Sequence, residues 1–172
     1  MSAMLSPPRD GANDAVATIT FRAFNEIESV KVAAIESDVY AFPWSAGNFV
    51  DSLVNGYRCI GAWIGNELVS YAVVMTALDE AHLLNLAVAK NWQQRGVGAA
   101  MLTQVIDAMR EQRFEVIYLE VRPSNAAGRR LYERFGFKQL GMRRDYYPAL
   151  TGREDALFLG LNIATDITAK PL

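Results

Sequence analysis

Residues suited to covalent or metal chemistry are scarce in this chain. Among its 172 residues there is one cysteine, Cys59, and one histidine, His82. A lone cysteine cannot form an intramolecular disulfide and is typical of a reducing compartment; this one lies in an apolar stretch, where we expect a buried, inert thiol. His82 has no sequence partner for nucleophilic catalysis, and no residues have metal-ligand spacing. The sequence thus predicts neither a cysteine nucleophile nor a metal site.

Long apolar runs and an excess of one charge are also missing. The longest apolar stretches are of strand length, which excludes a transmembrane helix, and residues 1–14 lack the basic start and apolar block of a signal peptide. The formal net charge is −2 and the pI is near 5.5. This balance argues against general nucleic-acid binding, which needs a clustered basic surface. We therefore expect a cytoplasmic protein that binds neither membranes nor nucleic acid directly.

One compact core accounts for the hydrophobic residues, which make up 51% of the chain. We predict a flexible leader with prolines and glycine at residues 1–14, a single domain at residues 15–163, and a frayed tail at residues 164–172. No second domain and no internal repeat is visible in the sequence.

Hydrophobic spacing predicts the elements of the first part of the domain. We expect a strand over residues 16–21, a helix over residues 26–38, and a short helix over residues 45–54 with Ser45 as its N-cap. The residues expected to face the core are Ile27, Val30, Ala34 and Ile35 in the first helix and Phe49, Leu53 and Val54 in the second.

The remaining elements complete a mixed sheet flanked by helices. Strands at residues 57–64 and 67–78 form a hairpin through a Gly-Asn turn pair, which suits positive φ. Another strand precedes a helix, a further strand and helix follow, and two strands near residues 138–144 and 155–161 end the domain. This order, with about seven strands and about four helices, predicts an α/β or α+β fold.

The stretch at residues 93–98 reads Q-x-x-G-x-G and lies between a strand and an amphipathic helix. Small residues at a helix start let backbone N–H groups approach a bulky ligand, and the helix dipole favours phosphate there. The stretch is neither a G-x-x-x-x-G-K-[ST] loop nor a G-x-G-x-x-G loop. It is consistent with an anion-binding turn, and a plain turn explains the same pattern.

A further strand and helix follow this helix. Residues 114–121 are apolar except for two glutamates, which predicts a buried strand with Glu120 near its C-terminal end. We expect Ser124 to cap the next helix and Gly136 to end it.

Three motifs of this half occur together: the Q-x-x-G-x-G loop, the L-E-V strand, and the helix motif N-x-x-[AG]-R-x-L-Y-E-x-x-G-F that starts at Asn125. Jointly they resemble the GNAT superfamily of acetyl-CoA-dependent N-acetyltransferases. The stretches at residues 41–44 (AFPW), 143–148 (RRDYYP) and 152–156 (GREDA) are similar to its ribosomal-protein alanine N-acetyltransferase (RimI) family. The match covers residues 16–163 and implies the GNAT fold, with a mixed, mostly antiparallel twisted sheet.

Acetyl transfer to an amine needs a base for the amine and an acid for the leaving thiolate. A strand-end carboxylate can serve as the base, because partial burial makes it more basic. The resemblance assigns the base to Glu120 and the acid to Tyr132, twelve residues later. Two plainer interpretations stay open: Glu120 pairs with Arg122 or Arg130, and Tyr132 is a core aromatic. Glu80, just before the fourth strand, is the rival base.

The resemblance also implies the binding residues, with acetyl-CoA as the co-substrate and a protein N-terminus as the acceptor. Because Cys59 is expected to be inert, we expect direct transfer in a ternary complex. The acceptor would be the alanine N-terminus of a ribosomal protein; alternatives are a lysine side chain, a small amine, or a non-catalytic acyl-CoA-binding module. The expected acetyl-CoA contacts are Leu86, Ala87, Val88, Gln93, Gln94, Arg95, Gly96, Val97, Gly98, Ala99, Asn125 and Tyr132. The expected acceptor contacts are Phe42, Trp44, Glu80, Tyr146 and Tyr147.

Overall fold

The computed structural model describes residues 19–164, so the predicted leader and nearly all of the predicted tail lie outside the described residues. Of the strand predicted at residues 16–21, only the last part is described, and the observed β1 continues to Ala23. The elements are β1 (Thr20–Ala23), α2 (Ser29–Val39), α3 (Ala46–Val54), β2 (Arg58–Ile64), β3 (Glu67–Ala77), β4 (Glu80–Val88), η1 (Lys90–Trp92), α4 (Val97–Glu111), β5 (Val116–Val121), α5 (Ala126–Arg134), β6 (Lys138–Pro148) and β7 (Arg153–Asn162). Their order along the chain is the predicted one.

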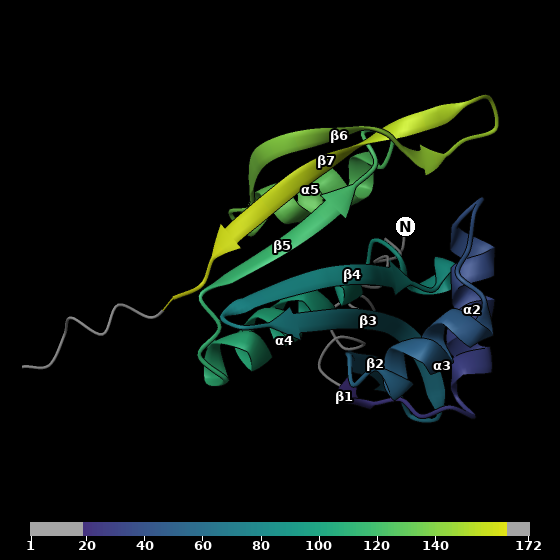
Figure 1. Ribbon diagram of the computed structural model, residues 1–172. Coiled ribbons are helices and arrows are strands. Elements are labelled where there is room, and N and C mark those ends of the chain that lie inside the picture. Colours follow the sequence, from purple (N-terminus) through teal and green to yellow (C-terminus); the bar gives the residue numbers. More distant parts are fainter. Residues whose placement is uncertain (1–18, 165–172) are drawn as a thin grey trace, which may run out of the picture.

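The strands of the described chain form one seven-stranded sheet in the order β1-β2-β3-β4-β5-β7-β6. Neighbouring strands are antiparallel, except that β4 and β5 run parallel. This confirms the predicted mixed, mostly antiparallel sheet. Figure 1 shows β4 and β5 side by side where they begin and diverging toward their C-terminal ends.

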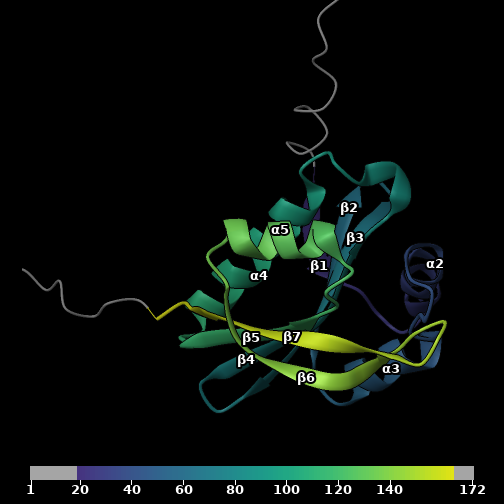
Figure 2. The ribbon, with the colours of Figure 1, turned by 90° about the horizontal axis from the view of Figure 1, so that it is seen from above.

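Helices cover both faces of the sheet and give the domain two hydrophobic clusters. α4 and α5 pack on one face and α2 and α3 on the other (Figure 2). β3 lies between the clusters: Tyr71 and Val73 belong to the α2–α3 side, Ala72 and Val74 to the α4 side. Burial on both faces explains why the β3 sequence is apolar without alternation.

The face of α2 that packs on the sheet differs from the predicted one. The helix begins at Ser29, three residues later than predicted, and Ile27 and Val30 are 86% and 67% exposed. Ala34 is exposed as well, and Ile35 is half-buried. The prediction was wrong because it counted apolar residues only, whereas two polar side chains of α2 find hydrogen-bond partners inside the protein. The fully buried residues of α2 are Ser29, Val32 and Glu36, and of the four predicted residues only Ile35 packs against the core.

The start of α3 is confirmed. Ser45 is the N-cap, its hydroxyl accepts from the Asn48 backbone N–H at 3.3 Å, and the Asn48 side chain accepts from the Ser45 N–H at 2.8 Å. This reciprocal pair is a capping box. Phe49 is fully buried as predicted, but Val54 is 73% exposed, because the last residue of the helix turns away from the sheet.

Substituting Ser45 tests this cap. Ser45→Ala removes the acceptor for the Asn48 N–H, and we expect unfolding free energy to fall by about 0.5–2 kcal/mol. Ser45→Thr keeps the hydroxyl and is expected to lose only a small fraction of that. Urea denaturation measures the free energy of unfolding of both variants, provided that their m-values equal that of the wild type. An Ala variant as stable as the wild type would contradict a stabilising cap.

The helix α5 is capped by a different residue from the predicted one. Asn125, not Ser124, is the N-cap, and its Oδ1 accepts from the Gly128 backbone N–H at 2.9 Å. The Ser124 N–H donates instead to the Glu154 carboxylate at 2.8 Å. Gly136 has φ +88°, which a glycine adopts without strain, and ends the helix as predicted. In the described part of the chain, no helix is both long and apolar enough to span a membrane.

Candidate active site

The divergence of β4 and β5 opens an unpaired strand edge in the middle of the sheet. The two strands pair from Glu80 and Val116 as far as Leu83 and Leu119 and no further. At this point Val73 and Val74 of β3 pair with Asn85 and Leu83, so Leu84 is an extra residue in β4. Within residues 19–164, the last part of β4 beyond this point is paired only with β3. Backbone groups on its other side have no strand partner there, so they bond to side chains or to a ligand.

All three β4 residues predicted to contact acetyl-CoA have their carbonyls bonded to side chains. The Leu86 carbonyl accepts from the Tyr40 hydroxyl at 2.8 Å, and the Val88 carbonyl accepts from Gln93 Nε2 at 3.1 Å. Ala87 has its carbonyl bonded to the Ser70 hydroxyl of β3 at 2.7 Å, and its side chain is buried. Successive residues of a strand direct their backbone groups to opposite edges. Because the backbone of Ala87 faces β3, the backbone groups of Leu86 and Val88 face the open edge.

The loop before α4 comes next to this edge. Gln94 and Gly96 both have positive φ, of 59° and 83°, which turns the chain sharply into the helix. A Cβ on Gly98 would stand 3.4 Å from the Val88 side chain, so the first turn of α4 packs closely on β4. The N–H groups and the positive end of the α4 dipole are thus beside β4, as an anion site requires. The other predicted loop residues are Gln93, Arg95, Val97 and Ala99, of which Val97 has its side chain in the core.

Glu120 lies on β5 just past the last residue that pairs with β4. Its side chain is 18% exposed, and Oε1 is 3.1 Å from Nε of Arg143 on β6. The alternative pairing with Arg122 or Arg130 was wrong: Arg122 instead binds Glu154 at 3.1 Å. Arg143 was missed by the sequence reasoning because the pair joins two strands that are not neighbours in the sheet, and the intervening β7 sets their distance.

Tyr132 projects from α5 and is 8% exposed, with its ring 5.6 Å from that of Phe137. Burial raises the pKa of the Tyr132 hydroxyl to about 12. A phenol with this pKa is protonated throughout the neutral range and can act only as a proton donor there. Tyr132 therefore packs in the core, as the plainer interpretation expected, and its hydroxyl stays protonated.

Two buried tyrosines interact electrostatically with the predicted base and acid. Burial, followed by the negative charge of Glu120, raises the pKa of Tyr147 above its usual range, and Tyr132 contributes to the same shift. Burial, followed by Tyr132, also raises the pKa of Tyr40. Glu120 and Tyr132 are therefore both near enough to Tyr147 to act on its charge, as one shared site would require. Tyr40, at the C-terminal end of α2, was not predicted.

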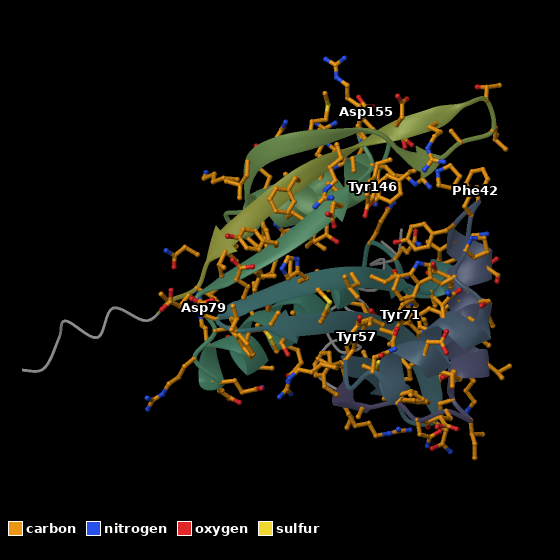
Figure 3. The ribbon with its side chains drawn as sticks, in the orientation of Figure 1. Phe42, Tyr57, Tyr71, Asp79, Tyr146 and Asp155 are labelled. Atoms are coloured by element: carbon orange, nitrogen blue, oxygen red, sulfur yellow. The ribbon has the colours of Figure 1, made fainter. Side chains whose placement is uncertain are left out.

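The predicted acceptor aromatics come from two segments that meet at one arginine. The guanidinium of Arg122 lies 4.3 Å from the Tyr147 ring centre and 5.8 Å from that of Phe42, and donates to the Pro148 carbonyl at 3.0 Å. Phe42 and Tyr146 are each 40% exposed. Figure 3 shows Phe42 at the end of α2 that faces the β6–β7 hairpin, with Tyr146 on the hairpin side. An acceptor could bind between these two segments.

Two other predicted acceptor residues are placed differently. Trp44 packs its ring 5.5 Å from Phe49, so it supports the chain segment between α2 and α3 from inside. Glu80 pairs in register with Val116, four residues before Glu120 on β5, so about 13 Å of strand separates the two glutamates. Figure 3 shows Asp79, the neighbour of Glu80, at the opposite end of the sheet from Phe42. The structure does not bring Glu80 to the site.

The remaining nucleophilic and basic candidates are accounted for by packing. Cys59 is 3% exposed, and burial raises the pKa of its thiol to about 11, so the thiol is protonated at neutral pH. The expected buried thiol is confirmed. His82 packs against Tyr118 with ring centres 5.4 Å apart and ring planes tilted by 48°, and lies 3.4 Å from the Glu80 carboxylate.

Comparison with known proteins agrees with this geometry. The pattern of the Acetyltransferase (GNAT) family matches residues 29–137. The chain is 38% identical over 130 residues, 76% of its length, to the [ribosomal protein bS18]-alanine N-acetyltransferase of Escherichia coli strain K12, of which the match covers 88%. It is 32% identical over 147 residues to the protein of that name from Haemophilus ducreyi, covering 85% of this chain and 98% of the relative.

A solved structure is similar over almost the same length. The crystal structure of the ribosomal-protein-S18-alanine N-acetyltransferase from Escherichia coli superimposes with a TM-score of 0.82 at 33% identity, covering 90% of this chain and 99% of that one. Fold and sequence pattern therefore agree. The chain belongs to the GNAT family of acetyltransferases.

Proposed function

We propose that this protein transfers the acetyl group of acetyl-CoA to the N-terminal α-amino group of a protein, the alanine N-terminus of a small-subunit ribosomal protein, in the cytoplasm. One observation supports the proposal most: Glu120 lies on β5 just past the last residue that pairs with β4, where the sheet opens, and both Glu120 and Tyr132 act on the pKa of Tyr147. The names of the relatives, which act on ribosomal protein bS18, support the choice of acceptor.

The two residues have complementary roles in the proposed reaction. The amine nitrogen forms a bond to the thioester carbonyl carbon, and the bond from that carbon to sulfur breaks. Glu120 accepts the proton that the amine loses, and Tyr132 donates a proton to the leaving sulfur. An α-amino group has a pKa near 7.7–8.0, against about 10.4 for lysine, so a carboxylate base is adequate for a protein N-terminus at neutral pH.

The chain around this pair supplies the binding groups for acetyl-CoA. The loop and first turn of α4 would hold the pyrophosphate through backbone N–H groups, with Arg95 adding positive charge. The open edge at Leu86 and Val88 would bind the pantetheine arm. Asn125 uses its Oδ1 to cap α5, which leaves its side-chain NH₂ to donate to the same arm.

Two peptides test the proposed acceptor. Thiol release from acetyl-CoA is measured with a basic peptide that has a free N-terminal alanine, and with a peptide that is N-terminally blocked and contains an internal lysine. We expect turnover on the free-alanine peptide only. Turnover on the blocked peptide alone would assign the activity to lysine, and turnover on neither would reject a peptide acceptor.

A further inference from the structure

A buried carboxylate lies next to the proposed site and has no role in the chemistry above. Glu36 of α2 is 2% exposed. It accepts hydrogen bonds from the Trp44 backbone N–H at 3.0 Å, from Asn85 Nδ2 at 3.1 Å, and from the Tyr71 hydroxyl. A carboxylate is excluded from protein interiors unless such donors compensate for its lost hydration. The three donors together compensate for the lost hydration of this buried carboxylate.

The three donors come from three different parts of the fold. Tyr71 lies on β3, Asn85 on β4, and Trp44 in the segment at residues 40–45 that joins α2 to α3. Figure 3 shows Tyr71 between the sheet and the two helices. Burial, followed by the charge of Glu36, raises the pKa of Tyr71, so its hydroxyl stays a donor to the carboxylate. Glu36 thus links the α2–α3 segment to the strand that carries the open edge.

The same segment has a second tie to that strand. Tyr40 caps the C-terminal end of α2, and its hydroxyl donates to the Leu86 carbonyl at 2.8 Å. The segment is therefore fixed to β4 at both ends, with Phe42 exposed between the two ties against Arg122. The position of Phe42 over the site depends on these ties.

Loss of the carboxylate would affect the partners unequally. Asn85 is paired in register with Val73, and Tyr71 with Ala87, so the sheet holds both residues without Glu36. Residues 40–45 belong to no helix or strand. Between the Tyr40 N–H, which donates to the Glu36 carbonyl at 2.9 Å, and the Ser45 cap of α3, the segment lies outside the helix and sheet ladders, and such a segment moves most when a side-chain tie is removed. The acceptor side of the site should then change, and the acetyl-CoA side should not.

We propose that Glu36 is a positioning residue that holds the α2–α3 segment at the correct distance from β4 for acceptor binding. The inference deepens the proposed function and rests on it, since Phe42 is assigned to the acceptor site. The segment's fixed position, however, can be measured without turnover.

Kinetics of three variants provide the first test. Glu36→Ala should raise KM for the free-alanine peptide by roughly 10–100-fold, while KM for acetyl-CoA changes less than about twofold. Glu36→Gln keeps a carbonyl oxygen for the Trp44 N–H and Asn85 and should restore the peptide KM to nearly the wild-type value. Tyr71→Phe is the matched control: it removes one donor from the same network, leaves the Trp44 bond intact, and should not change the peptide KM.

Hydrogen exchange of residues 40–45 provides the second test and needs no activity. Exchange should accelerate in Glu36→Ala but not in Tyr71→Phe. If Glu36→Ala does not fold, the double variant Glu36→Leu with Tyr71→Phe replaces both members of the carboxylate–hydroxyl pair by apolar groups and serves for both tests.

The results separate two kinds of failure. A wild-type protein inactive on both peptides would reject the proposed function, and exchange alone would then decide the role of Glu36. Unchanged exchange in the carboxylate-free variant would overturn the inference, as would equal effects on the two KM values or an effect of Tyr71→Phe as large as that of Glu36→Ala.

Discussion

Glu120→Gln is expected to lower kcat on the alanine peptide by roughly 10²–10⁴-fold at pH 7, the usual contribution of a general base. The amide has nearly the shape of the carboxylate and can still accept from the Arg143 guanidinium, which is 3.1 Å away, so the fold should persist. The defect should shrink as the pH rises through about 8, because the α-amino group then loses its proton without help. Thiol release between pH 6 and 9.5 measures both effects.

Glu80→Gln is the matched control, because Glu80 was the rival base and its side chain is 44% exposed at the far end of β4. It should keep kcat within about twofold of the wild type, as is usual for surface changes away from a site. A large loss in Glu80→Gln with a small one in Glu120→Gln would transfer the role of base to Glu80. Thermal melting of both variants checks that neither loss comes from unfolding.

Tyr132→Phe is expected to lower kcat by about 10²-fold or more, because it removes the proton donor for the leaving thiolate and nothing else. KM for acetyl-CoA should change little, since the ring and its contact with Phe137 remain. Because the pKa of Tyr132 is raised to about 12, the wild-type rate should show no alkaline decline from this group below that range. Single-turnover kinetics separate the chemical step from product release.

Tyr57→Phe is the corresponding control. Tyr57 immediately precedes β2 and packs against the cluster on the α2–α3 side, away from Tyr132. Tyr57→Phe also removes one phenolic hydroxyl. Because Tyr57 lies away from Tyr132, the rate of this variant should stay at the wild-type level. Equal rates for Tyr132→Phe and the wild type would show that another group, or water, protonates the thiolate.

The raised pKa of Tyr132 also makes the free energy of unfolding depend on pH. In the unfolded chain a tyrosine ionises near pH 10, whereas in the folded protein this one ionises near 12. Below pH 10 both states are protonated and the contribution of the buried phenol is complete; it is lost as the pH rises from 10 through 12. Activity measurements up to pH 9.5 therefore lie in the range where this contribution is intact.

Local patterns were sufficient for the elements that depend on neighbouring residues. The helix start at Ser45, the helix stop at Gly136 and the turn at Gly65 follow from caps and from positive φ, which act within a few residues. The number and order of the strands followed from hydrophobic spacing. Counting apolar residues failed for α2, where Glu36 replaces an apolar side chain in the core.

The sequence by itself determined the order of elements, the glycine loop, and the presence of a glutamate at the end of β5 and a tyrosine in α5, because each is encoded within a short stretch. Tertiary structure alone decided which charges meet. The partner of Glu120 is Arg143, two strands away in the sheet, and the partners of Glu36 come from β3, β4 and the α2–α3 segment. The physical reason is that a buried charge loses its hydration. Hydrogen-bond donors must replace that hydration, and packing brings them within about 3 Å however distant they are in the sequence.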